Sequence, residues 1–413
     1  MAEKADVLVL GAGVIGVASA HYLAARGRKV TVLDAGGIGS GCSHGNAGLA
    51  VPSHSIPMAQ PGMIARGMKW MFHADSPFYV KFRWEWALFS WLWKFHAACR
   101  EDRMRRAIPL LRDLSLASVR LYDELAGPDC HYGRRGLLLA YRTPRGYEEG
   151  LHEARLLAEF GLASNAMDGP AARALAPSLR DVLAGAIHFP GDAHFDPALF
   201  VSGLAAKAST AGATFRPETE VRGFEIAGRR IAAVRTSTGD FAADEIVLAT
   251  GSWSPSVARG LGLAIPIQPA KGYSITMKAP ASPPPLPLLL MESRIAVTPM
   301  GLNLRLAGTL ELAGLDLSIN ERRVEAIRRG AREWLDGLDG LPELEVWRGL
   351  RPCTPDGLPI LGRPAAYDNL ILATGHAMIG MSLGPITGKL VAEIASRERP
   401  SIDVAVLSPD RFS

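Results

Sequence analysis

The chain has 413 residues, of which 48% are hydrophobic and 21% are charged, a balance typical of a folded globular protein. This length is too great for one small core, so we expect two closely packed domains. A formal net charge of +4 is too small to indicate a nucleic-acid-binding protein. The four cysteines show neither the C-x-x-C spacing of a metal site nor a disulfide pattern, so no metal is expected.

No targeting or membrane-spanning segment is indicated. The chain passes directly into an apolar strand at Asp6, without a charged-then-apolar leader. No apolar run reaches the ~18 residues that a spanning helix needs. We therefore expect a cytoplasmic protein.

The first 34 residues predict a dinucleotide-binding turn. Residues 6–10 form an apolar run of strand length, and Gly11, Gly13 and Gly16 follow it at G-x-G-x-x-G spacing. In such a turn the first glycine makes the tight bend, the second lets the backbone approach a pyrophosphate, and the third lets the helix pack on the strand.

The residues that follow extend this prediction. Val14 and Ile15 open an apolar helix whose first N–H groups and positive dipole end can face phosphates. The next apolar strand ends on Asp34, where a carboxylate can take the ribose hydroxyls.

A glycine-rich loop, residues 36–48, comes directly after Asp34. Ser40, Ser43 and Asn46 are interleaved with its glycines. A flexible linker is one interpretation, but a pure spacer does not need these hydrogen-bonding side chains. The loop therefore favours contact with the same ligand.

Together, the strand–helix start, the acidic strand end and the run Ser-x-x-Asn-Ala-Gly resemble the FAD-dependent oxidoreductases of the D-amino-acid oxidase type. Within that group the bacterial D-amino-acid dehydrogenases are the most similar. The resemblance extends from Asp6 to about Ile394, and NAD enzymes do not share the second loop. It implies an α/β fold with a Rossmann-like FAD-binding domain and an antiparallel-sheet substrate domain, as in D-amino-acid oxidase and glutathione reductase. We expect residues 1–75, 185–265 and 345–413 in the FAD-binding domain, and residues 76–184 and 266–344 in the substrate domain.

Farther along, residues 52–61 form a proline-rich loop that contains His54. The stretch 67–72 also resembles the dehydrogenases, and from there to Leu125 the chain is expected to be helical. This span is rich in tryptophan, and Phe89, Trp93 and His96 fall on one helical face. Either this face packs on the core, or with nearby basic residues it forms a patch for peripheral contact with a membrane.

The middle of the chain alternates short strands and helices. Strands are expected at residues 136–141, in a hairpin at 221–239, and at 245–249, 271–277, 295–299 and 303–308. Helices are expected at 147–160, 198–211 and 322–335. Asp192, His194 and Asp196 look like metal ligands, but helix capping is the better interpretation because Asp196-Pro197 precedes a helix.

The C-terminal part is expected to return to the cofactor. A buried strand at residues 370–373 leads through a glycine turn into a helix from about Ser382, so its dipole can stabilise negative charge on the flavin. Besides the glycine turn and Asp34, the resemblance implies FAD contacts at Ser43, Asn46, Ala47, Gly48, Val221, Thr250, Gly251, Gly375, Met378, Ile379 and Gly380. The FAD is expected to be non-covalent, because Cys353 does not align with the attachment cysteine of sarcosine oxidases.

The resemblance also implies the chemistry, in which an amino acid loses its α-hydrogen as a hydride to flavin. Such a substrate needs a cation for its carboxylate. Arg351, in the run Leu-Arg-Pro-x-Thr-x-Asp-Gly, is the expected clamp, with a structural ion pair to Asp356 or another carboxylate as the alternative. Tyr273, His54 and His376 are candidates for hydrogen bonds to the amine or carboxylate. Met378 stands where related oxidases often have a basic residue, which favours a bulkier or more apolar substrate.

We therefore expect oxidative deamination of D-amino acids, with electrons passed to a quinone, an electron-transfer protein or another acceptor. A cyclic imino acid such as D-proline or cis-4-hydroxy-D-proline is the alternative substrate. An NAD-dependent dehydrogenase fits only the first motif, and a non-enzymatic flavoprotein would not need Arg351. The oligomeric state and the electron acceptor do not follow from the sequence.

Overall fold

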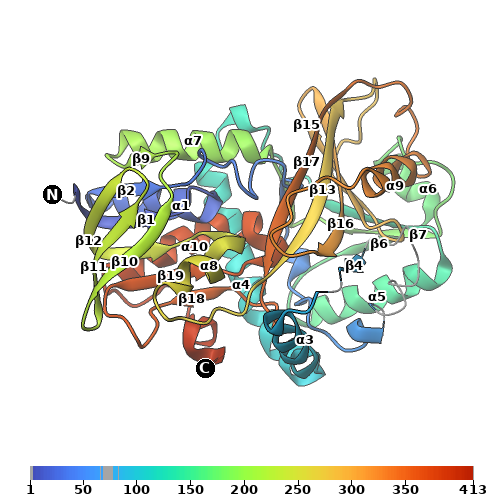
Figure 1. Ribbon diagram of the computed structural model, residues 1–413. Coiled ribbons are helices and arrows are strands. Elements are labelled where there is room, and N and C mark those ends of the chain that lie inside the picture. Colours follow the sequence, from blue (N-terminus) through green and yellow to red (C-terminus); the bar gives the residue numbers. More distant parts are fainter. Residues whose placement is uncertain (1–2, 66, 68–77, 82, 413) are drawn as a thin grey trace.

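The computed structural model describes residues 3–65, 67, 78–81 and 83–412. Its strands form two large sheets that lie side by side along the molecule, each with helices packed against it (Figure 1). The first sheet has eight strands and the second has nine.

The first sheet has the glycine turn near its centre. Its parallel core joins β1 to β2 on one side and to β12 on the other, and β12 pairs in parallel with β19. A hairpin, β10–β11, pairs with the first half of β12. The strands are β1 (Glu3–Leu10), β2 (Val30–Leu33), β9 (Thr214–Arg216), β10 (Val221–Ala227), β11 (Arg230–Thr236), β12 (Gly239–Leu248), β18 (Ile360–Gly362) and β19 (Leu370–Thr374).

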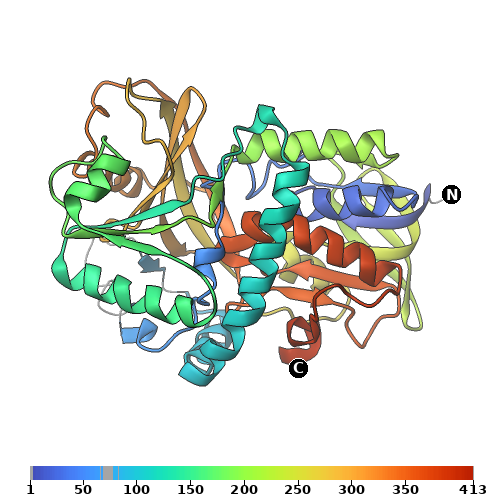
Figure 2. The same cartoon turned by 180° about the vertical axis from the view of Figure 1, so that it is seen from behind.

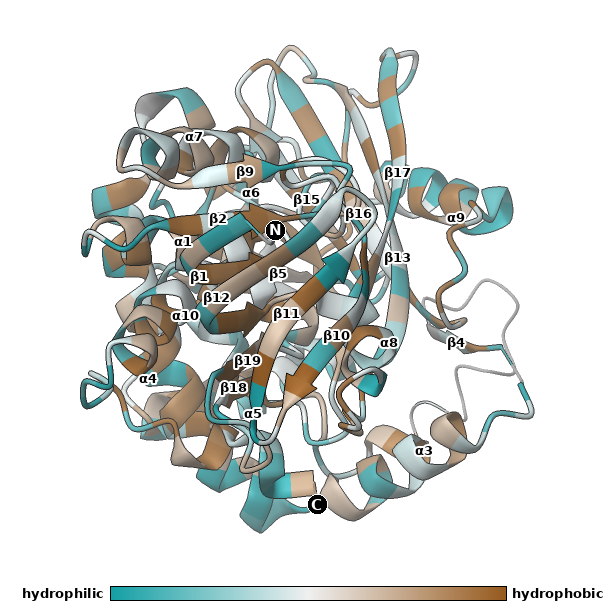
Figure 3. Cartoon of the chain, turned by 60° about the vertical axis from the view of Figure 1, so that its left-hand side comes forward, coloured by the Kyte–Doolittle hydropathy of each residue, from teal (hydrophilic) through white to brown (hydrophobic). Residues whose placement is uncertain are grey.

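Alternate residues of β1 enter two different cores. Val7 and Val9 pack with helices on one face, whereas Leu8 and Leu10 pack with the hairpin and α8 on the other. All four side chains are fully buried. Because side chains alternate across a strand, burial on both faces explains the continuous apolar run (Figure 3). The helices around this sheet are α1 (Val14–Ala24), α4 (Glu101–Leu125), α7 (Pro197–Thr210), α8 (Ser254–Arg259) and α10 (Gly380–Ala395).

The second sheet is mostly antiparallel, and α9 packs on one of its faces through Val324, Ile327 and Ala331. Its strands are β4 (Phe78–Val80), β5 (Leu137–Tyr141), β6 (Asn165–Met167), β7 (Gly185–Phe189), β13 (Gln268–Lys278), β14 (Leu288–Leu290), β15 (Ile295–Met300), β16 (Asn303–Leu312) and β17 (Glu343–Cys353). Its helices are α5 (Pro144–Glu159), α6 (Gly169–Leu175) and α9 (Glu321–Arg332).

Two elements connect the sheets. A two-stranded ribbon joins β3 (Leu49–Ala50) to β8 (Ala193–His194). The long helix α4 runs along the back of the molecule (Figure 2). Its Met104 and Ile108 pack with the second sheet, and its later turns, such as Leu111 and Leu114, pack with α10 and the first sheet.

The sheet pairings differ from the expected segment bounds at two points. Residue 185 begins β7, which pairs with β5 and β6 in the second sheet. Residue 345 lies inside β17, an edge strand of the same sheet. The chain therefore leaves the second sheet later than expected, after β7 ends at Phe189 and after β17 ends at Cys353.

The aromatic span is not one continuous helix. Residues 78–80 form β4, so the expectation of helix was wrong there. Helix α3 (Trp86–Ala98) ends at Cys99, and α4 begins at Glu101. Most of the stretch 67–72 lies outside the described residues. No helix in the described part of the chain is long and apolar enough to cross a bilayer.

Candidate active site

The glycine turn has the close backbone packing that its spacing predicts. Gly11 has a φ of 105°, and a Cβ there would lie 2.6 Å from the carbonyl oxygen of Ala249. A Cβ on Gly16 would lie 1.8 Å from the carbonyl oxygen of Gly11. Side chains are excluded at both positions, so β1, β12 and the start of α1 meet backbone to backbone.

Asp34 and Ser43 bind the backbone of this turn directly. The N–H of Ala12 donates to Oδ2 of Asp34 at 2.7 Å, and the N–H of Gly36 donates to Oδ1 at 2.8 Å. The N–H of Val14, at the start of α1, donates to Oγ of Ser43 at 3.0 Å. Two side chains from the connection between β2 and β3 therefore hold the N-terminal end of α1, which is the part of the fold that favours anions.

The other predicted cofactor segments approach the same turn. The N–H of Thr219, two residues before Val221, donates to the carbonyl of Asp34 at 2.7 Å. The N–H of Ala249 donates to the carbonyl of Leu10 at 2.8 Å, which brings Thr250 and Gly251 to the turn. In addition, the hydroxyl of Thr374, next to Gly375, donates to the carbonyl of Gly251 at 3.2 Å.

The glycine-rich loop continues into the second part of the site. The side-chain oxygen of Asn46 accepts the N–H of Gly48 at 3.0 Å. Arg305, on β16, donates to the carbonyls of His44 and Asn46 at 3.2 and 2.9 Å. Arg305 could not be found from the sequence, because a buried arginine within a strand has no motif of its own. Arg305 therefore holds the glycine-rich loop against the second sheet.

A cavity of about 830 Å³ lies between this loop and the second sheet. Ala47 and Asn46 line it from the loop, and Met378 and Ile379 line it from the turn before α10. Strands β13, β16 and β17 form a further wall, and α3 contributes Leu88, Trp91 and Phe95 among others. Most lining side chains are apolar, which is typical of a small-molecule site with a few placed polar groups.

Arg351, on β17, is one of those polar groups. A Cβ on Gly272 would lie 2.2 Å from its Nη1, so the glycine leaves room for the guanidinium. Nη1 donates to the carbonyl of Thr309 at 2.9 Å. Thr309 has a φ of 68°, a strained conformation for a β-branched residue. The alternative partner of Arg351, Asp356, instead pairs with Arg411 at 2.8 Å.

The guanidinium of Arg351 therefore has most of its donors available. In the described part of the chain no carboxylate lies within ion-pair distance of it. Burial lowers the pKa of Arg351, yet a guanidinium remains charged in proteins. Four further N–H donors remain beyond the one directed at Thr309.

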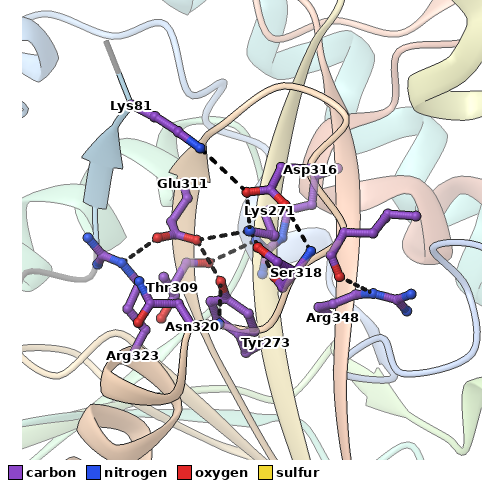
Figure 4. Close-up of polar contacts among 12 residues, drawn as sticks. Lys81, Lys271, Tyr273, Thr309, Glu311, Asp316, Ser318, Asn320, Arg323 and Arg348 are labelled. Atoms are coloured by element: carbon purple, nitrogen blue, oxygen red, sulfur yellow. Dashed lines mark hydrogen bonds and ion pairs between the residues drawn. The ribbon is translucent and has the colours of Figure 1, made fainter. Parts of the chain in front are cut away.

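Tyr273 borders the cavity, but its hydroxyl belongs to a different cluster. The hydroxyl donates to Glu311 at 2.7 Å, and Glu311 also pairs with Arg323 (Figure 4). Burial and Glu311 raise the pKa of Tyr273. Tyr273 follows Gly272 on β13, and successive side chains of a strand point to opposite faces. Since Gly272 faces Arg351, the tyrosine is directed to the other side of the sheet.

His376 is also directed away from the cavity. Its imidazole is 2% exposed, and Nε2 lies 3.0 Å from the hydroxyl of Thr387 on α10. Burial lowers the pKa of His376 to about 3, so the ring is neutral. Cys353 is fully buried and is not among the residues that line the cavity.

His54 lies in the cavity wall, in a short 3-10 turn (Pro52–His54). Its Nδ1 is 3.0 Å from the hydroxyl of Ser53. Burial, together with the charge of Arg294, lowers the pKa of His54 to about 4. Arg294 and Glu153 line the same cavity. Neither residue lies in a motif, so the sequence analysis did not find them.

Asp192 and Asp196, two of the three residues that look like metal ligands in the sequence, have different hydrogen-bond partners. Asp196 caps α7, with its carboxylate accepting the N–H groups of Ala198 and Leu199 at 2.9 and 3.2 Å, as predicted. Asp192 does not cap a helix, and its carboxylate accepts hydrogen bonds from Ser53 instead. No group of three or more His, Cys, Asp or Glu side chains able to hold a metal is found among the described residues.

Comparison with known proteins identifies the family. Residues 6–394 match the family described as DAO, FAD dependent oxidoreductase. The chain belongs to this family. The oxidoreductase is 35% identical to a D-amino acid dehydrogenase of Granulibacter bethesdensis, over 98% of this chain and 99% of the relative. A D-amino acid dehydrogenase of Methylobacterium nodulans is 36% identical over the same shares.

Solved structures share the fold of the oxidoreductase. Glycine oxidase from Geobacillus kaustophilus has a TM-score of 0.79 at 24% identity, covering 99% of both chains. L-Proline dehydrogenase from P. horikoshii has a TM-score of 0.80 at 21% identity, covering 100% of this chain and 98% of its own. The predicted family and the predicted fold class are thus confirmed.

FAD is the cofactor of this family, and the residues present fit it. The N-terminal end of α1 points its amides toward the loop that carries Ser43. A Cβ on Gly13 would have Ser43 Oγ at 3.5 Å as its nearest neighbour, and a Cβ on Gly251 would meet nothing within 4 Å. Open space at two turns beside a helix N-terminus suits a pyrophosphate. The individual cofactor contacts remain predictions.

Proposed function

We propose that this oxidoreductase oxidises D-amino acids, with Arg351 as the clamp for the substrate carboxylate. The observation that carries the proposal is a half-buried guanidinium, without a carboxylate partner in the described part of the chain, in the wall of an apolar cavity. The D-amino acid dehydrogenases that are 35 and 36% identical over nearly the whole chain support the substrate class.

The FAD would be held without a covalent bond by the glycine turn, Asp34, Ser43 and the start of α10. When bound, it supplies an acceptor for the hydride and its electron pair. Burial raises the pKa of the Cys353 thiol to about 12, so this residue would be a poor nucleophile toward a flavin. The positive end of α10, at Gly380, would stabilise negative charge at the nearby cavity wall.

The chain's own contribution would be orientation and exclusion of water. A bidentate contact from Arg351 fixes the carboxylate and thereby the direction of the Cα–H bond. Trp347 closes one side of the cavity, because a Cβ on Gly45 would lie 2.2 Å from its indole. Leu88 and Phe95 on α3 offer an apolar wall to the substrate side chain. This surface favours bulky or apolar D-amino acids.

We also propose that α3 carries the contact with the electron acceptor. Trp86 and Trp93 are 85% and 74% exposed, as is Trp84 just before the helix at 87%. Trp91, from the same helix, is buried and donates to the carbonyl of Cys353 at 2.9 Å. Exposed tryptophans with basic neighbours suit a membrane surface, where a quinone would be reduced. Co-sedimentation with anionic liposomes, compared between wild type and Trp86→Ser/Trp93→Ser, tests this.

The deciding experiment is anaerobic bleaching of the bound flavin by a panel of D- and L-amino and imino acids. Bleaching by linear D-amino acids supports the proposal. Bleaching by D-proline or cis-4-hydroxy-D-proline alone would assign the imino-acid substrate instead, and no bleaching would overturn both. Arg351→Met should raise KM about 100-fold or more, with FAD still bound. Arg348→Met is the matched control, because Arg348 lies on the same strand and donates to the carbonyl of Leu317.

A further inference from the structure

Asp192 is a buried acid without a cationic partner. Its side chain is 1% exposed, and no Lys, Arg or His lies within ion-pair distance in the described part of the chain. Burial raises its pKa to about 7, although two hydrogen bonds from Ser53 act in the opposite direction. A buried carboxyl is costly unless it is paired, so this position calls for an explanation.

Ser53 connects this acid to the cavity. Its N–H donates to Oδ1 of Asp192 at 3.1 Å, and its hydroxyl donates to Oδ2 at 2.5 Å. Because its single hydroxyl proton is directed at Asp192, Ser53 must accept from Nδ1–H of His54, 3.0 Å away. This contact assigns the tautomer of His54 and leaves Nε2 as its proton acceptor.

The surroundings keep the ring of His54 neutral, so Asp192 is the group of the two that can hold a proton near neutral pH. Arg294 and Glu153 share the cavity wall with His54, and Arg294 disfavours an imidazolium there. On the other side, the N–H of Gly136 donates to the carbonyl of Asp192, and the nearby charged or titratable groups are Arg135 and His194. Above about pH 7, Asp192 is ionised and His54 is neutral.

We propose that His54, Ser53 and Asp192 form a relay that removes a proton from the substrate ammonium. This inference rests on the proposed function, because a hydride leaves Cα only when the nitrogen lone pair is free. The ammonium gives one proton to Nε2 of His54, Nδ1–H passes one to Ser53, and the Ser53 hydroxyl passes one to Asp192. No electrons move in this step. His54 acts on the substrate, and Ser53 and Asp192 act through it.

The pH profile of kcat/KM tests the relay. In wild type, activity should fall as the pH drops below about 7, because Asp192 is then already protonated. Asp192→Asn and Ser53→Ala should lower kcat/KM at pH 8 on the order of 100-fold, the usual contribution of a placed base. The loss should shrink as the pH approaches the pKa of the free amino acid's ammonium. Ser55→Ala is the matched control, since Ser55 is buried in the same turn but donates to the carbonyl of Pro52. A uniform loss at every pH would overturn the relay.

A second measurement does not depend on turnover. 2-Aminoisobutyrate has no hydrogen on its α-carbon, so it cannot lose a hydride and serves as a probe that is not oxidised. Its addition to the holoenzyme at pH 8 should produce the infrared C=O stretch of a protonated carboxyl in wild type and Ser55→Ala. The band should be missing in Ser53→Ala and Asp192→Asn. If D-amino acids bleach the flavin of wild type but saturating 2-aminoisobutyrate gives no such band, the relay is overturned and the proposed function is not. If no amino acid bleaches the flavin, the proposed function itself fails.

Discussion

The guanidinium of Arg351 lies where a side chain on Gly272 would be, since a Cβ on that glycine would lie 2.2 Å from Nη1. The two residues are on neighbouring strands, with Gly349 opposite Gly272 and Ala270 opposite Arg351. Two glycines and an alanine therefore form the sheet surface beside the arginine. A long cation can lie along this surface and remain in the cavity wall.

We therefore expect Gly272→Ala to raise KM for the amino-acid substrate at least tenfold. The added methyl group displaces the guanidinium, and a tenfold change corresponds to about 1.4 kcal/mol of binding. FAD content should not change. Gly203→Ala, in α7, is the control, because a Cβ there meets nothing within 4 Å and alanine favours a helix. An unchanged KM in Gly272→Ala would contradict the assigned role of Arg351.

Asp34→Ala should weaken FAD binding and leave the apoprotein folded. The substitution removes the acceptors for the N–H of Ala12, in the glycine turn, and for the N–H of Gly36, at the start of the glycine-rich loop. Losing hydrogen bonds to a charged acceptor costs roughly 1.5–3 kcal/mol each, so Kd for FAD should rise at least tenfold. Fluorescence titration of the apoprotein with FAD measures this. Asp6→Ala is the control, since Asp6 accepts from the exposed backbone of Lys29. Equal Kd values for both variants would argue against the role of Asp34.

The parts of the site that the sequence predicted depend on short-range spacing. The glycine turn and the helix cap at Asp196 follow from local rules about tight turns and helix ends. The interacting residues either lie within one strand–turn–helix unit or are brought together because their strands are neighbours in the parallel sheet.

The rest of the site could not be predicted from the sequence, because it depends on which face of a strand or helix meets the cavity. Tyr273 borders the cavity and His376 lies close in sequence to Met378, which lines it, but the polar atoms of both are directed away, toward Glu311 and Thr387. A strand buried on both faces gives no sign of which face carries a ligand. Asp192 and Ser53 are 139 positions apart, so their hydrogen bonds could not be anticipated from spacing.

The buried ionic cluster behind the sheet makes a prediction about stability (Figure 4). Glu311 lies between Lys271 at 3.7 Å and Arg323, and it also accepts from Tyr273. Glu311→Gln would remove the carboxylate that pairs with Arg323 and leave Lys271 with Asp316 at 3.3 Å, which should cost about 3–5 kcal/mol. Lys271→Met should cost less, because Glu311 keeps Arg323 and Tyr273. Chemical denaturation measures both, and an equal loss would contradict this order.

His376 makes the fold sensitive to acid. Its pKa is lowered to about 3 by burial, from 6.5 in the unfolded chain, so the unfolded state binds more protons between these values. The contribution of His376 to stability should therefore fall as the pH drops from 6.5 toward 3, by up to about 1.4 kcal/mol for each pH unit. His376→Gln, which can keep a hydrogen bond to Thr387, should reduce this slope. Urea denaturation at pH 7, 6 and 5 measures the slope in both proteins. His152→Gln, on the α5 surface, is the control and should leave the slope unchanged. The same slope in wild type and His376→Gln would show that other groups dominate acid unfolding.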